Sequence, residues 1–198
     1  GIDGLSAKIH DAFTLNIDHY VTIKMNGFKE LVDAMGGVKM NVPVSFELDG
    51  VTIKKGTQVL NGNEAEAVVR ERHSYATADI GRLETQRVFI AALLQQMLSM
   101  PKTDLMGLVP TLAQYVTTDL SINEILGYVN LFHGFDLSNM TMHLMPGESY
   151  YMQSNKTSYY SIHKDKLVEM INEYFKPFSD PITADDINCE ELANNSKS

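Results

Sequence analysis

The sequence has a single cysteine, Cys189, so no disulfide can form within the chain. One cysteine also leaves the redox compartment of the protein open. No run reaches the roughly 18 apolar residues that a membrane-spanning helix needs. The chain begins without an initiator methionine and without the basic and then apolar segments of a signal peptide. We therefore expect a fragment of a longer protein, with any export signal or membrane anchor outside this sequence.

Positive charge is scarce as well. The formal net charge is -9 and the isoelectric point is near 5.0, which argues against broad attraction to nucleic acid or to an anionic membrane surface. The sequence also lacks a helix-turn-helix pattern with basic residues, so transcriptional control is disfavoured. A chain of 198 residues, 44% of them hydrophobic, is long enough to bury a sizeable core. One compact domain is the expectation.

Hydrophobic periodicity predicts alternating helices and strands. The predicted helices cover residues 5–13, 28–35, 63–69, 79–100, 103–116, 121–132 and 167–175. The predicted strands cover residues 20–25, 38–42, 140–145 and 159–163, and a hairpin over 46–53 turns at Asp49-Gly50. Strands interspersed with helices over one core imply a layered α/β fold. From residue 177 to 198 the sequence is acidic and polar, which predicts a mobile C-terminal tail.

The arginines are confined to one segment. The chain has four, Arg70, Arg72, Arg82 and Arg87, all within 18 residues, whereas its lysines are scattered. An arginine side chain presents a rigid planar fork that matches phosphate and carboxylate oxygens, and it keeps its charge when partly desolvated. An acidic protein with every guanidinium in one segment is therefore a candidate for binding an oxyanion there.

The spacing of polar residues after this segment adds to the argument. Asp79, Arg82 and Gln86 fall on one stripe of the helix predicted to begin near residue 79, and that stripe continues as apolar Phe89. The N-terminus of a helix also attracts anions. The alternative is structural, an ion pair of Asp79 with Arg82 beside an ordinary helix cap. Spacing alone leaves both open.

The sequence contains the stretches NIDHYVTIKMNGFKELVDAMGGVKMNVP and GTQVLNGNEAEAVVRERHSYATADIGRLETQRVFIAALL, and later MHLMPGESYYMQSNKTSYYSIHKDKLVEMINEYF. These three segments resemble the LytR-CpsA-Psr family. The specific part is an Arg-x-Arg pair, a loop, and Asp-x-x-Arg followed by Gln. In this sequence these residues are Arg70, Arg72, Asp79, Arg82 and Gln86. The resemblance predicts a family domain over residues 1–176 and leaves 177–198 unmatched.

The resemblance implies a three-layer α/β/α sandwich around a mixed central sheet. It implies an extracytoplasmic protein of a Gram-positive bacterium, held to the cell membrane by an N-terminal anchor absent here. Its activity would be that of a phosphotransferase, which moves a teichoic acid- or capsule-type polymer from a polyprenyl pyrophosphate carrier to peptidoglycan; no nucleic acid is involved.

By motif match, Arg70, Arg72, Arg82 and Gln86 would hold pyrophosphate oxygens or shape the pocket. Arg70 and Arg82 would be the catalytic residues, and Asp79 would orient the arginines rather than act as a base. Magnesium is the implied cofactor, because it helps to neutralise the pyrophosphate.

The sequence departs from the family pattern in two respects. The family's N-terminal part, with an Arg-Ser-Asp and a Pro-Arg-Asp stretch that supply acidic metal-site residues, is absent, and no remaining Asp, Glu or His cluster has magnesium-ligand spacing. Thr85 stands where the family often has a further basic residue. The alternative function is therefore a non-catalytic module that binds a polyprenyl pyrophosphate or another polyanion of the cell envelope.

Two further features each have a structural and a functional interpretation. His73 lies in the loop between the arginine pair and the helix, where it is either a proton carrier or a solvated side chain. The pairs Tyr150-Tyr151 and Tyr159-Tyr160 are either a carbohydrate-stacking surface or ordinary strand packing.

Overall fold

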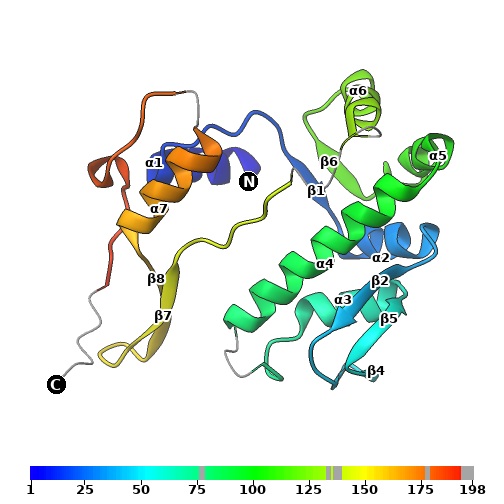
Figure 1. Ribbon diagram of the computed structural model, residues 1–198, viewed down its shortest axis with the longest axis horizontal. Coiled ribbons are helices and arrows are strands. Elements are labelled where there is room, and N and C mark those ends of the chain that lie inside the picture. The colour runs from blue at the N-terminus through cyan, green and yellow to red at the C-terminus, as the bar shows by residue number, and fades with distance from the viewer. Residues whose placement is uncertain (76–78, 133–134, 136–139, 177–178, 193–198) are drawn as a thin grey trace. The chain divides into compact units, whose positions relative to one another are not determined.

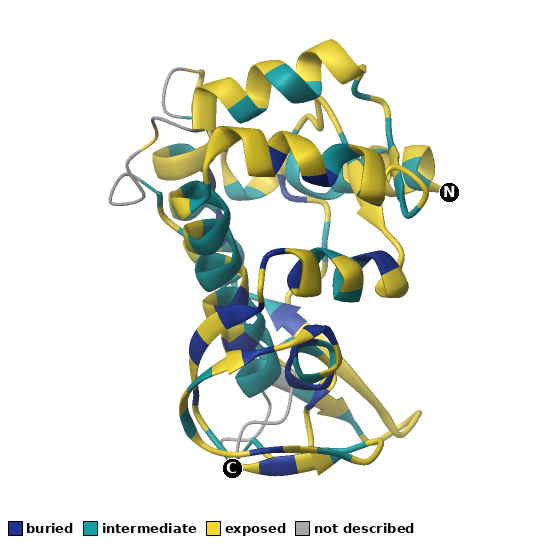
Figure 2. Cartoon of the chain, turned by 90° about the vertical axis from the view of Figure 1, so that its right-hand side faces the viewer, coloured by how far each residue is buried: buried dark blue, intermediate teal, exposed yellow. Residues whose placement is uncertain are grey.

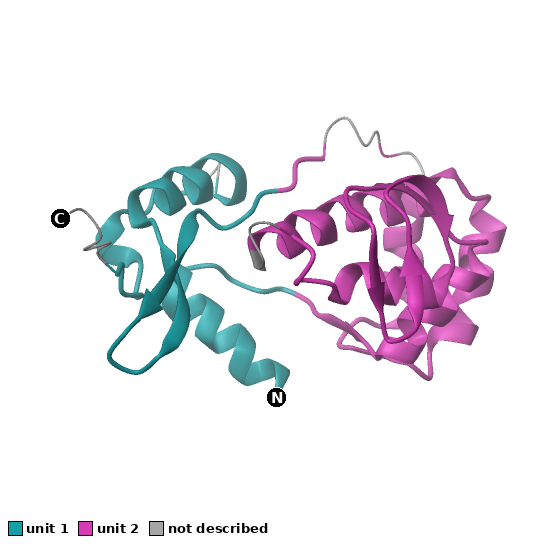
Figure 3. Cartoon of the chain, turned by 90° about the horizontal axis from the view of Figure 1, so that it is seen from below, with its two compact units in different colours: residues 1–18, 143–198 teal, residues 19–142 magenta. Residues whose placement is uncertain are grey.

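The computed structural model describes residues 1–75, 79–132, 135, 140–176 and 179–192, except for the side chain of Asp79. The chain forms two compact units (Figure 3). Unit 1 combines residues 1–18 with residues 143–198, and unit 2 consists of residues 19–142. This differs from the single compact domain expected from length and composition. Composition cannot reveal a unit that is assembled from both ends of a chain.

The helices and strands predicted within unit 2 occur in the predicted order (Figure 1), and two further strands, over residues 56–60 and 116–118, were not predicted. The helices are α2 (Met25–Ala34), α3 (Gly62–Arg70), α4 (Asp79–Ser99), α5 (Lys102–Leu112) and α6 (Ile122–Phe132). The strands are β1 (Val21–Ile23), β2 (Val38–Val42), β3 (Phe46–Leu48), β4 (Val51–Ile53), β5 (Gly56–Leu60) and β6 (Val116–Thr118). No residue of α6 is buried (Figure 2). Among the described residues, no helix has both the length and the apolar character that crossing a membrane requires.

The mixed α/β class is confirmed, but the described strands do not join into one mixed sheet. They form four two-stranded antiparallel sheets, β1 with β6, β2 with β5, β3 with β4 and β7 with β8. Antiparallel neighbours can be linked by very short connections, whereas parallel neighbours need a long crossover. The β3–β4 hairpin is such a short connection. Its two turn residues, Asp49 and Gly50, take positive φ angles of 51° and 80°. The turn predicted at this dipeptide is confirmed.

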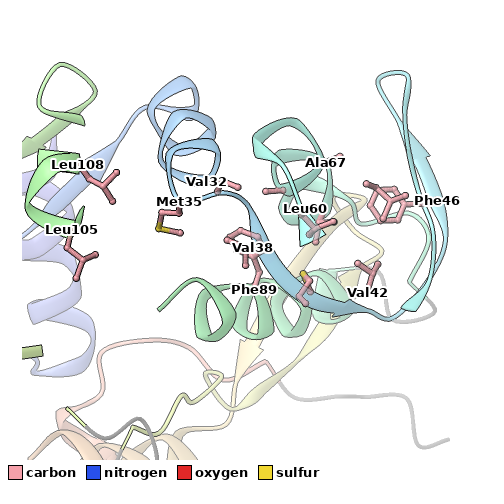
Figure 4. Packing of buried hydrophobic residues seen from close by; sticks show 14 residues of the cluster. Val32, Met35, Val38, Val42, Phe46, Leu60, Ala67, Phe89, Leu105 and Leu108 are labelled. Atoms are coloured by element: carbon pink, nitrogen blue, oxygen red, sulfur yellow. The ribbon is translucent and has the colours of Figure 1, made fainter. Parts of the chain in front are cut away.

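The core of unit 2 lies between α4 and the elements α2, α3 and β2. Strand β2 alternates strictly, with Val38, Met40 and Val42 buried. Phe89 of α4 is 1% exposed, and its ring centroid lies 5.6 Å from that of Phe28 on α2. Figure 4 shows Val38, Val42 and Phe89 with the other buried apolar side chains of this cluster. The contact between Phe89 and Phe28 therefore fixes the rotation of α4 about its own axis.

Helices α2 and α3 approach closely at one glycine. A Cβ atom built on Gly62 would lie 2.5 Å from the backbone oxygen of Lys29, so a larger residue would push the helices apart. The start of α3 is capped, because the Asn61 side chain accepts a hydrogen bond from the Glu64 amide at 3.0 Å and the Glu64 carboxylate accepts one from the Asn61 amide at 2.9 Å. These features fix the position of α3, which ends at Arg70.

Unit 1 contains α1 (Ile2–Phe13), β7 (Gly147–Met152), β8 (Thr157–Ile162), α7 (Lys164–Met170), a π-helical turn (Ile171–Phe175) and a 3₁₀ helix (Ala184–Asp186). The strand expected over 159–163 is confirmed as β8, whereas residues 140–145, expected as a strand, are irregular. Alternating apolar residues at 140–145 were not sufficient for a strand, because within the described part of the chain no segment pairs with them.

Part of the expected mobile tail is packed. Ile182 and Ile187 are 7% and 2% exposed and join Leu167 and Ile171 in the core of unit 1. The amide of Leu192 also donates a hydrogen bond to the Ser161 hydroxyl at 2.9 Å. A polar composition concealed this packing, because the two isoleucines are isolated in sequence and their partners come from α7 and the π-helical turn. Residues 177–178 and 193–198 lie outside the described part of the chain.

Replacing Phe89 by alanine should lower the free energy of unfolding by about 3–5 kcal/mol, because it removes a fully buried aromatic ring and leaves a cavity. Val88→Ala is the control, since Val88 is the adjacent residue of α4 and is 45% exposed. It should change stability by less than about 0.5 kcal/mol. Urea denaturation followed by circular dichroism measures both variants. Similar losses for the two variants would contradict this orientation of α4.

Candidate functional site

Unit 2 has a pocket of about 440 Å³ where α3 ends and α4 begins. The residues that line it are Leu48, Val69, Arg70, Glu71, Arg72, His73, Arg82 and Gln86. Four of the five residues selected from the sequence are thus brought together, namely Arg70, Arg72, Arg82 and Gln86. The fifth, Asp79, is the first residue of α4, and its side chain is outside what the structure describes.

Arg70 is the last residue of α3, and two carboxylates contact its guanidinium. Its Nη1 atom lies 3.2 Å from Oε1 of Glu66, one helical turn earlier, and 3.1 Å from Oδ2 of Asp49 in the β3–β4 turn. The Arg70 side chain remains 50% exposed. Both contacts involve Nη1. The two carboxylates orient Arg70 and partly balance its charge.

Arg72 follows the helix on an extended segment. The residue between the arginines, Glu71, is the C-cap of α3 and has extended φ and ψ angles of -61° and 135°. Arg70 is therefore still helical, whereas Arg72 lies beyond the helix. Both residues line the pocket because the chain turns away from α3 directly after Arg70. Arg72 is exposed, and its Nε atom lies 3.5 Å from Nε2 of His73.

Gln86 joins the two helices that flank the pocket. Its Nε2 group donates a hydrogen bond of 2.7 Å to the backbone oxygen of Val69. Val69 is the penultimate residue of α3, where backbone carbonyls lack partners within the helix. The side chain amide of Gln86 therefore supplies a partner that the helix cannot. This contact shapes the pocket and leaves the amide oxygen of Gln86 as an acceptor.

Arg82 lies on α4 one turn before Gln86 and lines the pocket from that helix. Arg87 is not among the lining residues; its Nη1 group instead donates to the backbone oxygen of Met142 at 3.4 Å. Three of the four arginines therefore share the site. Three guanidinium groups in one concave pocket suit a ligand with several phosphate oxygens, because each fork can donate two hydrogen bonds to such oxygens.

Glu71 is the negative group of this pocket. The residue is buried, at 3% exposure, and its carboxylate accepts a hydrogen bond from the Ser74 amide at 2.8 Å. Burial raises the pKa of this carboxyl, but hydrogen bonds from the backbone of Ser74, His73 and Arg72 and from the Ser74 hydroxyl outweigh burial and lower its pKa overall. Glu71 is therefore ionised at neutral pH.

Several of these residues were not selected from the sequence. Glu66 could have been found from its spacing to Arg70, because residues four apart are neighbours on a helix. Asp49 could not, since the ion pair joins segments 21 residues apart in a way that only the tertiary fold decides. Leu48 and Val69 carry no polar signal at all. His73 lines the pocket as an exposed loop residue, and its role stays a prediction.

The residues that the structure describes do not fit a magnesium site. Within the described ranges, no three His, Cys, Asp or Glu side chains converge on a common point. Glu71 accepts hydrogen bonds from its own loop, and Asp49 and Glu66 are paired with Arg70. Magnesium prefers six oxygen ligands in a near-octahedral arrangement. No chemical step through a metal is derived from these residues.

Fold and pocket together define a mixed α/β protein whose pocket presents three guanidinium groups. The chain belongs to the LytR_cpsA_psr family, which it matches over residues 1–176. The resemblance identified from the sequence motifs is therefore confirmed.

Two curated relatives show how much of the longer proteins this chain represents. The polyisoprenyl-teichoic acid--peptidoglycan teichoic acid transferase TagV of Bacillus subtilis is 29% identical over 170 residues, which are 81% of this chain and 43% of TagV. The cell wall biosynthesis protein LcpA of Corynebacterium glutamicum is 30% identical over 151 residues, or 74% of this chain and 29% of LcpA. The chain thus spans less than half the length of either relative.

Solved structures share the fold. The crystal structure of B. subtilis TagV has a TM-score of 0.79 at 26% identity, and the similarity covers 92% of this chain and 72% of that one. A structure of TagT bound to LIIa-WTA has a TM-score of 0.69 at 24% identity, covering 87% of this chain and 66% of that one. At that identity the second likeness shows the fold alone.

Replacing Gln86 by glutamate should lower the free energy of unfolding by about 1–3 kcal/mol, because a carboxylate would face the Val69 carbonyl in place of the N–H donor. Gln95→Glu is the matched control, since Gln95 is an exposed residue of the same helix. Thermal or urea unfolding of the two variants measures the difference. Equal stability of the two would mean that the contact between Gln86 and Val69 does not join α3 to α4 in solution.

Proposed function

We propose that the parent protein is a cell-wall glycopolymer phosphotransferase and that this pocket binds the pyrophosphate of a polyprenyl-linked glycan. The observation that carries the proposal is the convergence of Arg70, Arg72 and Arg82 on one pocket in a protein with a net charge of -9. The names of the relatives support the class of reaction, because TagV is a polyisoprenyl-teichoic acid--peptidoglycan teichoic acid transferase. The acceptor would be peptidoglycan, and the cargo a teichoic acid or a capsule-type polymer.

The proposed reaction exchanges the phosphoanhydride bond of the pyrophosphate for a phosphate ester bond to the acceptor. A hydroxyl of the acceptor would form a bond to the phosphorus that carries the glycopolymer and release its proton to solvent, while the bond from that phosphorus to the carrier phosphate breaks. Negative charge increases on the departing polyprenyl phosphate. Arg70 and Arg82 are the proposed catalytic residues, because charge-assisted hydrogen bonds from their guanidinium groups would stabilise the developing charge. Arg72 and Gln86 would bind or position the same phosphates.

Asp79 is proposed to orient the arginines rather than to act as a base. It begins α4, and Arg82 lies three residues later on the same side of that helix. Glu66 and Asp49 contribute the same kind of orientation to Arg70 from outside the sequence motif. The site is thus proposed to hold its arginines by carboxylates that do not themselves contact phosphate.

A second candidate function is a non-catalytic module that binds polyprenyl pyrophosphate or another polyanion of the envelope. The observation that favours it is the misfit between the described residues and a magnesium site. The two functions separate in one assay, in which the full-length protein is given a lipid-linked glycan, peptidoglycan fragments and magnesium. Transfer supports the phosphotransferase; binding with no transfer favours the module. A magnesium titration of the pyrophosphate complex tests whether the metal enters with the ligand.

The proposed location is outside the cytoplasmic membrane of a Gram-positive bacterium, with an anchor in the longer protein. The support is the class of relatives, which include a teichoic acid transferase and a cell wall biosynthesis protein. Fractionation of cells that produce the full-length protein, with protease added to intact protoplasts, tests it. Digestion of the family domain in intact protoplasts is the expected result, and complete protection would contradict the proposal.

Arg82→Ala and Arg70→Ala should each weaken binding of a polyprenyl pyrophosphate analogue by about 1.5–3 kcal/mol, which is the value of a charge-assisted hydrogen bond. Lys54→Ala and Lys55→Ala are the controls, because they remove the same charge from exposed positions in the same unit that do not line the pocket. Arg82→Lys should restore binding only in part, because a point charge cannot reproduce the fork. Calorimetric titration measures all five variants. Equal affinities across the arginine and lysine variants would contradict the site.

A further inference from the structure

Glu71 is an unexpected group for a phosphate pocket. It stands between Arg70 and Arg72, lines the same pocket and is almost fully buried, at 3% exposure. A buried carboxylate next to a bound pyrophosphate would repel it. A negative charge at this place therefore needs a physical role that outweighs the repulsion.

The contacts of Glu71 indicate such a role. Its Oε1 atom accepts a hydrogen bond from the Ser74 amide at 2.8 Å, which ties the backbone three residues later to the carboxylate. The backbone of Arg72 and His73 and the Ser74 hydroxyl lower the pKa of this carboxyl as well, so the loop that follows Glu71 favours its charged form.

The geometry of Glu71 disfavours two other roles. A general base must reach the proton that it removes, whereas Glu71 is 3% exposed and its Oε1 atom accepts the Ser74 amide. Its lowered pKa also makes it a weak base at neutral pH. Among the residues that the structure describes, no group of three His, Cys, Asp or Glu side chains could hold a metal ion.

We propose that Glu71 is a positioning residue, whose buried carboxylate holds the backbone of residues 72–74 and so places Arg72 in the phosphate pocket. Without this anchor, the loop that carries Arg72 has no fixed conformation, and ordering it on binding would cost affinity. The inference rests on the proposed function, because it assigns a role within the same pyrophosphate site. It adds a residue that the family motif of arginines, Asp79 and Gln86 does not include.

The sign of one substitution separates positioning from simple electrostatics. Glu71→Gln removes the negative charge while keeping the size of the side chain, so electrostatics alone predicts tighter binding of pyrophosphate. Positioning predicts the opposite, a loss of roughly tenfold in affinity, because the neutral amide oxygen of glutamine accepts the Ser74 N–H less strongly than a carboxylate does. Glu84→Gln is the control, since Glu84 is an exposed residue of α4 outside the pocket, and it should leave the affinity unchanged.

A double-mutant cycle tests whether Glu71 acts through Arg72. Inorganic pyrophosphate is titrated into the wild type, Glu71→Gln, Arg72→Ala and the double variant. If Glu71 only positions Arg72, the Glu71→Gln substitution should cost much less affinity once Arg72 is alanine. A general loss of stability would instead weaken both backgrounds equally. Amide hydrogen exchange at residues 72–74 should be faster in Glu71→Gln than in Glu84→Gln.

Each outcome decides between the claims. If the wild type does not bind pyrophosphate, the proposed function fails and the inference fails with it. If the wild type binds and Glu71→Gln binds equally well or more tightly, the inference alone is overturned. Should Glu71→Gln not fold, Ser74→Pro replaces it, because that change removes the backbone N–H group that donates to the carboxylate and keeps the negative charge. It should weaken binding in the same direction, and unchanged affinity would overturn the inference.

Discussion

The orientation of helix α4 is the constraint on which the pocket depends. Arg82, Gln86 and Phe89 lie at positions i, i+4 and i+7, so they share one face of the helix. The burial of Phe89 against Phe28 fixes that face toward the core of unit 2. The same rotation brings Gln86 to the Val69 carbonyl and Arg82 to the pocket. Hydrophobic packing in the body of α4 thereby decides where the polar groups of its first turns lie.

A second principle of the site is that positive groups are held by carboxylates of the protein. Arg70 contacts Asp49 and Glu66, and Lys29 also contacts Glu66, at 3.3 Å. Such exposed or half-exposed ion pairs contribute little to stability, typically under about 1 kcal/mol. Their value here is orientation, because a guanidinium that is already directed loses less freedom when a ligand binds. An acidic protein can therefore present a basic pocket without a large net positive surface.

The loop after α3 combines both effects. The helix ends at Arg70, and the chain leaves it in an extended conformation at Glu71. The buried carboxylate of Glu71 accepts a hydrogen bond from the backbone amide of Ser74. The arginines on either side of Glu71 thus reach the pocket from different backbone conformations, one helical and one extended. Two residues so close in the sequence therefore differ in backbone conformation. The short distance between the two residues is what brings both to the pocket.

The amino-acid sequence by itself determined the features that depend on local patterns. These are the α/β class, the turn at Asp49-Gly50, most helix positions, and the confinement of arginine to one segment. Of the five residues selected in and next to that segment, four line one pocket. Periodicity and turn chemistry act over a few residues, so they can be read directly. The tertiary structure alone decided the pairing of Arg70 with Asp49, the burial of Glu71 and of Ile187, and the division into two units. Each of these depends on contacts between segments far apart in the chain or on which side of a loop becomes enclosed, and no local pattern records that.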